Sequence, residues 1–172
     1  VLCAWAGGCS GPKPVEVYRH TLQMAAQTDS MAVLEFYTEW CGPCRTFESD
    51  LAEGGPLSET ASNITLLRID AEDPAWSGVT RGFRIHTYPT FVAVDVEGKE
   101  VHRWHGYAGA EGFEQEYANA LTNPVRVDDL IEEFEAEPSA ALAWDIAFRL
   151  GRDRRYSDAA TYFDRCAELM SA

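Results

Sequence analysis

Basic residues are scarce in this 172-residue sequence. Lysines and arginines number 14 against 28 aspartates and glutamates, which gives a formal net charge of −14. A nucleic-acid-binding protein needs a basic surface to meet the phosphate backbone, and attraction to an anionic membrane also needs positive charge. The charge balance argues against both, and we expect no nucleic-acid partner.

Long hydrophobic runs are also missing. A membrane-spanning helix needs about 18 or more consecutive apolar residues, and the sequence has no such run. A chain of 172 residues is long enough for one domain, or for one domain with an appendage. It can bury a core without disulfide bonds, so its five cysteines require another explanation.

The first part of the sequence, residues 1–12, is apolar and then rich in small residues. This pattern predicts the remnant of an export signal or a lipobox-like leader, although no basic segment precedes it. Ala6-Gly7-Gly8-Cys9 resembles a bacterial lipobox, which makes Cys9 a candidate for lipidation and membrane anchoring. We therefore expect an extracytoplasmic location, namely the periplasm. A leader with incidental cysteines is the alternative.

Between residues 13 and 122 the pattern alternates between helices and strands. Near-continuous apolar runs predict buried strands, and apolar residues spaced three and four apart predict amphipathic helices. The expected strands are 32–37, 64–70, 90–95 and 101–105, and the expected helices are 16–28, 41–53, 75–83 and 112–121. This order predicts the α/β class, with a parallel strand pair and a final antiparallel hairpin.

Residues 123–172 form a helical extension with three expected helices, at 128–137, 140–150 and 155–170. Asn123-Pro124 and Glu137-Pro138 interrupt the chain before and after the first of them. The last two helices resemble one tetratricopeptide hairpin. An amphipathic extension of no named family is the alternative. A single tetratricopeptide unit cannot bury its own apolar face, so we expect it to pack on the preceding domain or to continue into further repeats.

The chemical motif is Cys41-Gly42-Pro43-Cys44, directly after the first expected strand. A Cys-x-x-Cys beside a βαβ pattern is typical of a redox-active dithiol. Cys41 would stand at a helix start, where free N–H groups and the helix dipole favour a thiolate and lower its pKa below about 8.5. Cys44 would lie one turn deeper. Structural zinc would need a second ligand pair, which is missing, so we predict no metal site.

A second motif, Thr87-Tyr88-Pro89-Thr90, precedes the third expected strand. Proline disrupts a central strand unless it stands at the first position. A cis Tyr88-Pro89 bond would expose the Tyr88 backbone to a bound peptide, whereas a trans proline at a strand start is the ordinary alternative.

Taken together, Trp40-Cys-Gly-Pro-Cys44, the preceding apolar strand, Tyr88-Pro89-Thr90 and Gly106 resemble the thioredoxin family. The similarity covers the expected domain 13–122. It implies a thioredoxin fold, in which a central mixed sheet is flanked by helices and a cis-proline faces the dithiol. It also implies thiol–disulfide exchange with protein substrates, which would contact Trp40, Gly42, Pro43, Tyr88 and Pro89. Within the family, the sequence is most similar to exported members such as the C-terminal domain of DsbD.

Two positions depart from the family pattern. Glu35, six residues before Cys41, replaces the usual aspartate, and Leu66 replaces the lysine that often pairs with it. A buried Glu35 could accept the Cys44 proton through a water molecule. Without that lysine we expect nothing to oppose desolvation, so the Glu35 pKa should be strongly raised. We expect Arg68 to be solvated.

The sequence thus predicts a thioredoxin-like protein-disulfide reductase with Cys41, Cys44 and Glu35 as its catalytic residues. Its only redox group would be the Cys41–Cys44 disulfide, with no further cofactor. A thiol donor, either a membrane or a soluble reductase, would restore the dithiol. Three alternatives remain open: a partner-binding scaffold or redox sensor that uses the helical hairpin, a disulfide isomerase, and a cytochrome-maturation factor.

Overall fold

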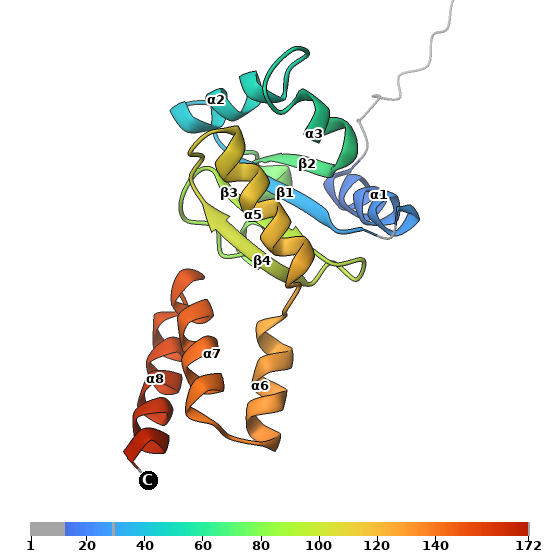
Figure 1. Ribbon diagram of the computed structural model, residues 1–172. Helices are drawn as coiled ribbons and strands as arrows, with labels where there is room; N and C mark the ends of the chain where they lie inside the picture. Colours follow the sequence, from blue (N-terminus) through green and yellow to red (C-terminus); the bar gives the residue numbers. More distant parts are fainter. Residues whose placement is uncertain (1–12, 29, 172) are drawn as a thin grey trace, which may run out of the picture.

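The computed structural model describes residues 13–28 and 30–171 (Figure 1). The predictions of an export signal and of a lipid anchor at Cys9 lie outside the described residues. Within the described ranges, no helix combines the length and the apolar character needed to cross a membrane.

Each of the four predicted strands is present, and most predicted helices begin and end within two or three residues of the expected positions. The elements are α1 (Pro14–Gln27), β1 (Ala32–Tyr37), α2 (Gly42–Leu51), α3 (Ser58–Asn63), β2 (Thr65–Asp70), η1 (Pro74–Trp76), α4 (Ser77–Gly82), β3 (Thr90–Val94), β4 (Glu100–His105), α5 (Ala110–Thr122), α6 (Val127–Ala136), α7 (Ala140–Arg152) and α8 (Tyr156–Ser171). Two details differ: α3 was not predicted, and the single helix expected at 75–83 is divided into η1 and α4.

The strands form one mixed sheet in the order β2-β1-β3-β4. β1 pairs with β2 in parallel, and the pairs β1–β3 and β3–β4 are antiparallel. Both predictions for the sheet are therefore confirmed. β1 and β3 occupy the centre and are buried almost throughout, as their continuous apolar sequences require.

Helices cover both faces of this sheet. On one face, Phe47 of α2 and Phe113 of α5 pack against Val33 and Phe91 of the central strands. On the other face, Ala25 of α1 packs with Leu34. Alternate residues of a strand point to opposite faces, so the odd-numbered residues of β1 lie under α2. Glu35 belongs to that set, and this places its carboxyl group beneath the helix that carries the dithiol.

The last three helices, α6 to α8, have a separate apolar core. Phe134 of α6 and Ile146 and Leu150 of α7 are fully buried there, and Cys166 of α8, which forms no disulfide, is buried with them. α7 and α8 lie side by side as a hairpin below the sheet (Figure 1). The predicted hairpin is confirmed, and α6 supplies part of the cover that the hairpin lacks.

The α7–α8 turn meets the edge strand β4 through polar contacts. Arg103 is only 5% exposed and forms ion pairs with Glu100 and, across the junction, with Asp153 at 3.5 Å. The Arg152 guanidinium donates a hydrogen bond to the carbonyl of Arg103. Burial, followed by the charge of Glu100, raises the pKa of Asp153 to about 6, although the neighbouring arginines lower it in part. The helices are therefore attached by partly desolvated charges.

Candidate active site

The two motif cysteines form a disulfide at the start of α2. Their Cα atoms are 5.3 Å apart, and both residues are buried. Cys41 is the N-cap of α2, and its Sγ atom accepts a hydrogen bond from the backbone N–H of Cys44 at 3.2 Å. Pro43 stands in the first turn, where the missing N–H costs no helical hydrogen bond. The expected placement of the pair at a helix N-terminus is confirmed.

The Tyr88–Pro89 bond is cis, as one of the two sequence interpretations required. Pro89 directly precedes β3, and the Trp40 ring contacts the Tyr88 ring edge-on, with 5.8 Å between centroids. The Trp40 indole is largely exposed, and its Nε1–H donates to the carboxylate of Glu72 at 3.1 Å. Glu72 was not predicted from the sequence, because no local pattern connects it with Trp40.

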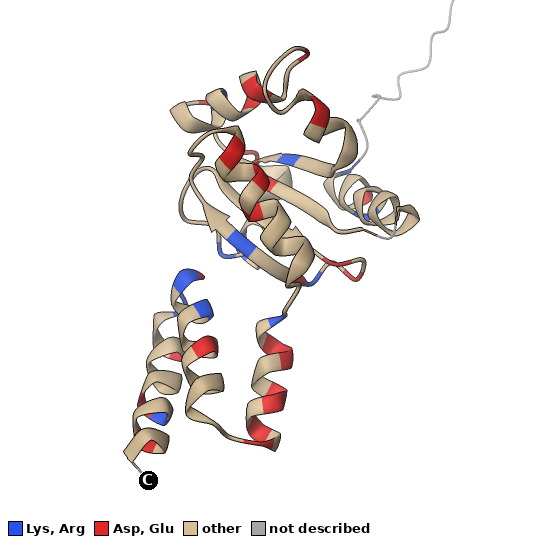
Figure 2. Ribbon diagram, viewed as in Figure 1, with Lys and Arg blue, Asp and Glu red and all other residues tan. Residues whose placement is uncertain are grey.

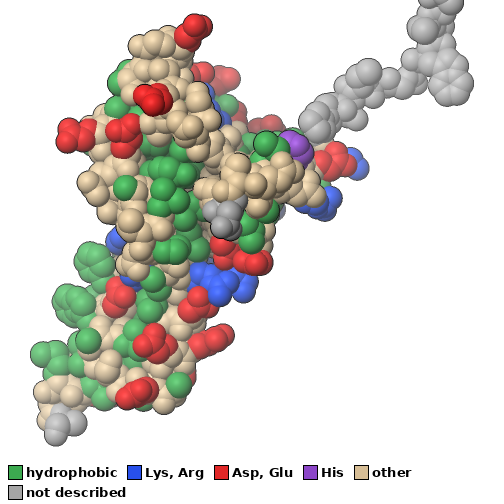
Figure 3. All heavy atoms as spheres, turned by 45° about the vertical axis from the view of Figure 1, so that its right-hand side comes forward, with side chains coloured by type: hydrophobic (Ala, Val, Ile, Leu, Met, Phe, Trp, Pro, Cys, Tyr) green, Lys and Arg blue, Asp and Glu red, His purple; other side chains and the backbone are tan. Residues whose placement is uncertain are grey.

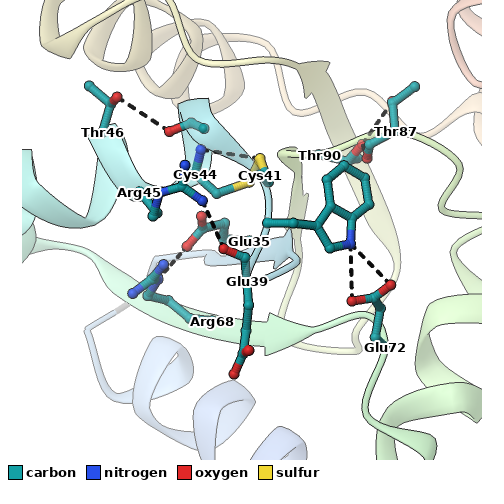
Figure 4. Close-up of a disulfide and its surroundings, with 12 residues drawn as sticks. Glu35, Glu39, Cys41, Cys44, Arg45, Thr46, Arg68, Glu72, Thr87 and Thr90 are labelled. Atoms are coloured by element: carbon teal, nitrogen blue, oxygen red, sulfur yellow. Dashed lines mark hydrogen bonds and ion pairs between the residues drawn. A yellow bond between two sulfur atoms is a disulfide. The ribbon is translucent and has the colours of Figure 1, made fainter.

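Glu35 is completely buried. Its Oε2 atom accepts a hydrogen bond from Nε of Arg68 at 2.5 Å, whereas Oε1 has no hydrogen-bond partner among the described residues. Burial raises the pKa of Glu35 to about 7, while the hydrogen bond and the charge of Arg68 lower it in part. Figure 4 shows the carboxyl group between the Arg68 guanidinium and the disulfide. A carboxyl group with this pKa can exchange a proton near neutrality.

The expectations for Arg68 and for an unopposed Glu35 carboxylate were wrong. Arg68 is the β2 residue in register with Glu35, and its Nη1 atom also lies 3.1 Å from Glu48. The guanidinium stands 4.7 Å from the ring centre of Tyr37, so only part of the side chain reaches solvent. Residues 66 and 68 share one face of β2 because strand side chains alternate. The cation is therefore present, but it comes from position 68 instead of position 66.

His105 connects this region with the C-terminal helices. Its Nδ1 atom lies 3.0 Å from Oγ1 of Thr90, the residue after Pro89, and its Nε2 atom lies 3.1 Å from the carbonyl oxygen of Arg152. A carbonyl only accepts, so Nε2 carries the proton. Burial lowers the pKa of His105, which favours the neutral ring. No sequence pattern indicates this link, because Arg152 is 47 residues away from His105.

Comparisons with known proteins agree with this geometry. The thioredoxin family model matches residues 14–119. The H-type thioredoxin of Ricinus communis is 32% identical over 98 residues, which cover 57% of this chain and 78% of the relative. Thioredoxin-1 of Drosophila melanogaster is 28% identical over 104 residues, which cover 60% of this chain and 88% of the relative. Among solved structures, a poplar thioredoxin h matches with a TM-score of 0.52 at 22% identity, covering 64% of this chain and 93% of that structure.

The helix-capping dithiol, the cis-proline and the mixed sheet define a thiol–disulfide oxidoreductase of thioredoxin type. The chain belongs to the thioredoxin family, and Cys41–Cys44 is its active-site pair. It is a disulfide reductase of that family. The helices α6 to α8 lie beyond the matched residues.

Proposed function

We propose that this reductase acts on protein disulfides with Cys41 as the attacking residue and Cys44 as the resolving residue. The observation that carries the assignment is the N–H···S hydrogen bond to Cys41, because a donor aimed at this sulfur stabilises it as an anion. The Cys41 thiolate attacks one sulfur of the substrate disulfide, and the other leaves as a thiolate. Cys44 then attacks Cys41, releases the second substrate thiol and leaves the Cys41–Cys44 disulfide. A thiol-donating reductase then returns two electrons to the Cys41–Cys44 disulfide and restores the dithiol.

Glu35 takes the proton of Cys44 in the second step of this proposal. Its Oε1 atom is the suitable acceptor, because Oε2 is already occupied by Arg68. A water molecule between Oε1 and Sγ of Cys44 would complete the path. The raised pKa of Glu35 matches this task, since a base titrating near 7 both accepts the proton and returns it to solvent.

The substrate would lie in an extended conformation beside the cis-proline. Trp40, Gly42 and Pro43 provide one side of the site, and Tyr88 and Pro89 provide the other. The large exposed fraction of Trp40, 65%, supports a contact role, because an exposed indole offers apolar area with little conformational cost.

Mixed-disulfide trapping tests the order of attack. Cys44→Ser should accumulate a mixed disulfide with insulin but not with the control, which is insulin that has been reduced and alkylated. Cys41→Ser should form no mixed disulfide. Glu35→Gln should still form the mixed disulfide but release it more slowly. If Cys41→Ser reduced insulin at the wild-type rate, or if Cys44→Ser turned over normally, the assignment would fail.

The reduction potential separates the reductase from the oxidising alternatives. A reduction potential of about −270 mV supports a reductase, and one of about −120 mV supports an oxidant. The Cys41–Cys44 disulfide and the buried carboxyl group of Glu35 argue against a scaffold that has lost redox activity. Binding of a partner with equal affinity in both redox states would favour the scaffold.

We propose that the protein is extracytoplasmic and carries a lipid anchor at Cys9, on the basis of the sequence of residues 1–12 alone. We also propose that the protein is similar to the exported members of the family, and that α7 and α8 are a tetratricopeptide hairpin; both proposals rest on sequence motifs. Fractionation of cells with metabolic lipid labelling, with Cys9→Ser as the matched variant, tests the anchor. A protein that stays in the cytoplasm without a lipid label would refute both localisation proposals.

A further inference from the structure

The basic residues of this acidic protein are distributed unevenly. A cavity of about 260 Å³ lies between the thioredoxin domain and the C-terminal helices. Half of the 14 basic residues of the chain line it. They are Arg84, Lys99, Arg103, Arg126, Arg149, Arg152 and Arg155. Figure 2 shows basic residues on both sides of this junction, and Figure 3 shows blue side chains gathered where the two parts meet.

Four of these cations are already neutralised. Arg103 pairs with Glu100 and Asp153, and the other three pair with aspartates on their own helices or on the β3–β4 turn. The remaining three are Arg84, Lys99 and Arg152. Within residues 13–28 and 30–171, none of them lies within 4.0 Å of a carboxylate. The side chains of Arg84 and Lys99 have no hydrogen-bond acceptor among the described residues, and Arg152 uses one N–H donor on the carbonyl of Arg103. The cavity therefore combines free N–H donors with the carboxylates of Glu100, Asp128 and Asp153, in a chain that has twice as many acids as bases.

Two helix ends bring arginines to the cavity. Arg84 has a φ of 51°, a left-handed conformation that residues with a Cβ seldom adopt. Arg154, which lies between the lining residues Asp153 and Arg155, has a φ of 57°. These are the two non-glycine residues with positive φ in the described chain, and both are arginines at this junction. Each of them follows the end of a helix, where the N–H groups of Ile85 and Arg155 bond the carbonyls of Thr80 and Leu150, so helix capping accounts for both conformations.

We propose that this cavity binds a small free anion that carries at least two phosphoryl groups. The planar guanidinium groups of Arg84 and Arg152 match phosphate oxygens, and Lys99 adds a third positive charge. The volume admits a small molecule. A net charge of −14 opposes approach to an anionic bilayer, so a free ligand is favoured over a lipid headgroup.

Pyrophosphate is the probe for this site. Calorimetric titration of the whole chain at constant ionic strength should show saturable binding, which sodium chloride does not reproduce. Arg84→Gln, Lys99→Gln and Arg152→Gln should each weaken the binding about tenfold, the usual effect of losing one charge-assisted hydrogen bond. Arg81→Gln is the control, because Arg81 is exposed, lies outside the cavity and undergoes the same charge change.

Several outcomes would overturn the proposal. One is the absence of saturable binding at millimolar pyrophosphate, and another is equal weakening by Arg81→Gln and the cavity variants. A third is cosedimentation with anionic phosphatidylglycerol vesicles that depends on Arg84, because this would assign the cations to a membrane. Arg84→Gln and Lys99→Gln alter exposed side chains without ion pairs, so both should keep wild-type insulin reduction and thereby show that they are folded.

Discussion

Arg68 and Glu35 face each other across the parallel pair of β1 and β2, joined by an Nε–H···Oε2 hydrogen bond of 2.5 Å. The bond uses one oxygen of the carboxyl group and leaves the other without a described partner. The arginine thus restrains the base and partly offsets the cost of its burial. The two oxygens therefore have different roles: Oε2 binds Arg68, and Oε1 remains available as an acceptor.

Replacing Arg68 should shift the pH profile of catalysis to higher pH. Both the hydrogen bond and the charge of Arg68 lower the pKa of Glu35, so in Arg68→Met that pKa should rise above its present value of about 7. The pH profile of mixed-disulfide resolution should shift in the same direction. Carboxyl carbon NMR of Glu35 and rapid-quench kinetics measure the two quantities. Arg81→Met is the control, and an unchanged pKa would contradict the assignment.

Glu35 should make the protein less stable as the pH rises. Its pKa is 4.5 in a model peptide and about 7 in the fold. Between these values the unfolded chain has lost the proton that the folded chain retains, so the free energy of unfolding falls with increasing pH, and the loss is complete above the folded pKa. Urea denaturation of Glu35→Gln from pH 4 to pH 8, a range of about four units, should lack this decline. Glu39→Gln, at an exposed position, should retain it.

Arg103 should be essential for the junction. It is buried, it pairs with Glu100 and Asp153, and it donates to the carbonyl oxygen of Phe83. Arg103→Met would leave partly buried carboxylates without a counter-charge, which should cost about 3 kcal/mol of stability. Chemical denaturation measures this cost. Hydrogen exchange should show the loss of protection in α7 and β4, and equal protection in the variant and the wild type would refute the role.

Phe47 should be a main contributor to the stability of the active-site helix. It is fully buried on α2, and its ring contacts those of Phe91, Tyr107 and Phe113 at centroid distances of 4.9 to 5.1 Å. Phe47→Ala should destabilise the fold by about 3–5 kcal/mol through lost burial and the cavity that remains. Phe148→Ala, on an exposed position of α7, should change stability by less than about 0.5 kcal/mol. Denaturant midpoints at constant m-value provide the comparison.

Local sequence pattern was sufficient to predict the strands and the position of the dithiol. The run 32–37 is apolar except for Glu35, as expected for a strand buried on both faces. Cys41 and Cys44 come close together because both lie at the start of one helix. The role of Arg68 was missed, since it depends on the register between two strands. α3 was missed because five of its six residues are polar and none of the six is buried, so no apolar periodicity marks it.

Packing of the hairpin on the preceding domain was one of two expectations, but the residues of the junction could not be predicted. Its contacts join residues of β4 to the α7–α8 turn, and hydrogen bonds between backbone carbonyls and distant side chains leave no trace in composition or spacing. The sequence indicated only that the helices needed a surface on which to pack.

The imidazole of His105 lies between the active-site region and the C-terminal helices. It spans from the hydroxyl of Thr90 to the carbonyl of Arg152, so one ring links the strand that follows the cis-proline to the C-terminal end of α7. A shift of Thr90 relative to the end of α7 would therefore lengthen one of the two contacts of this imidazole.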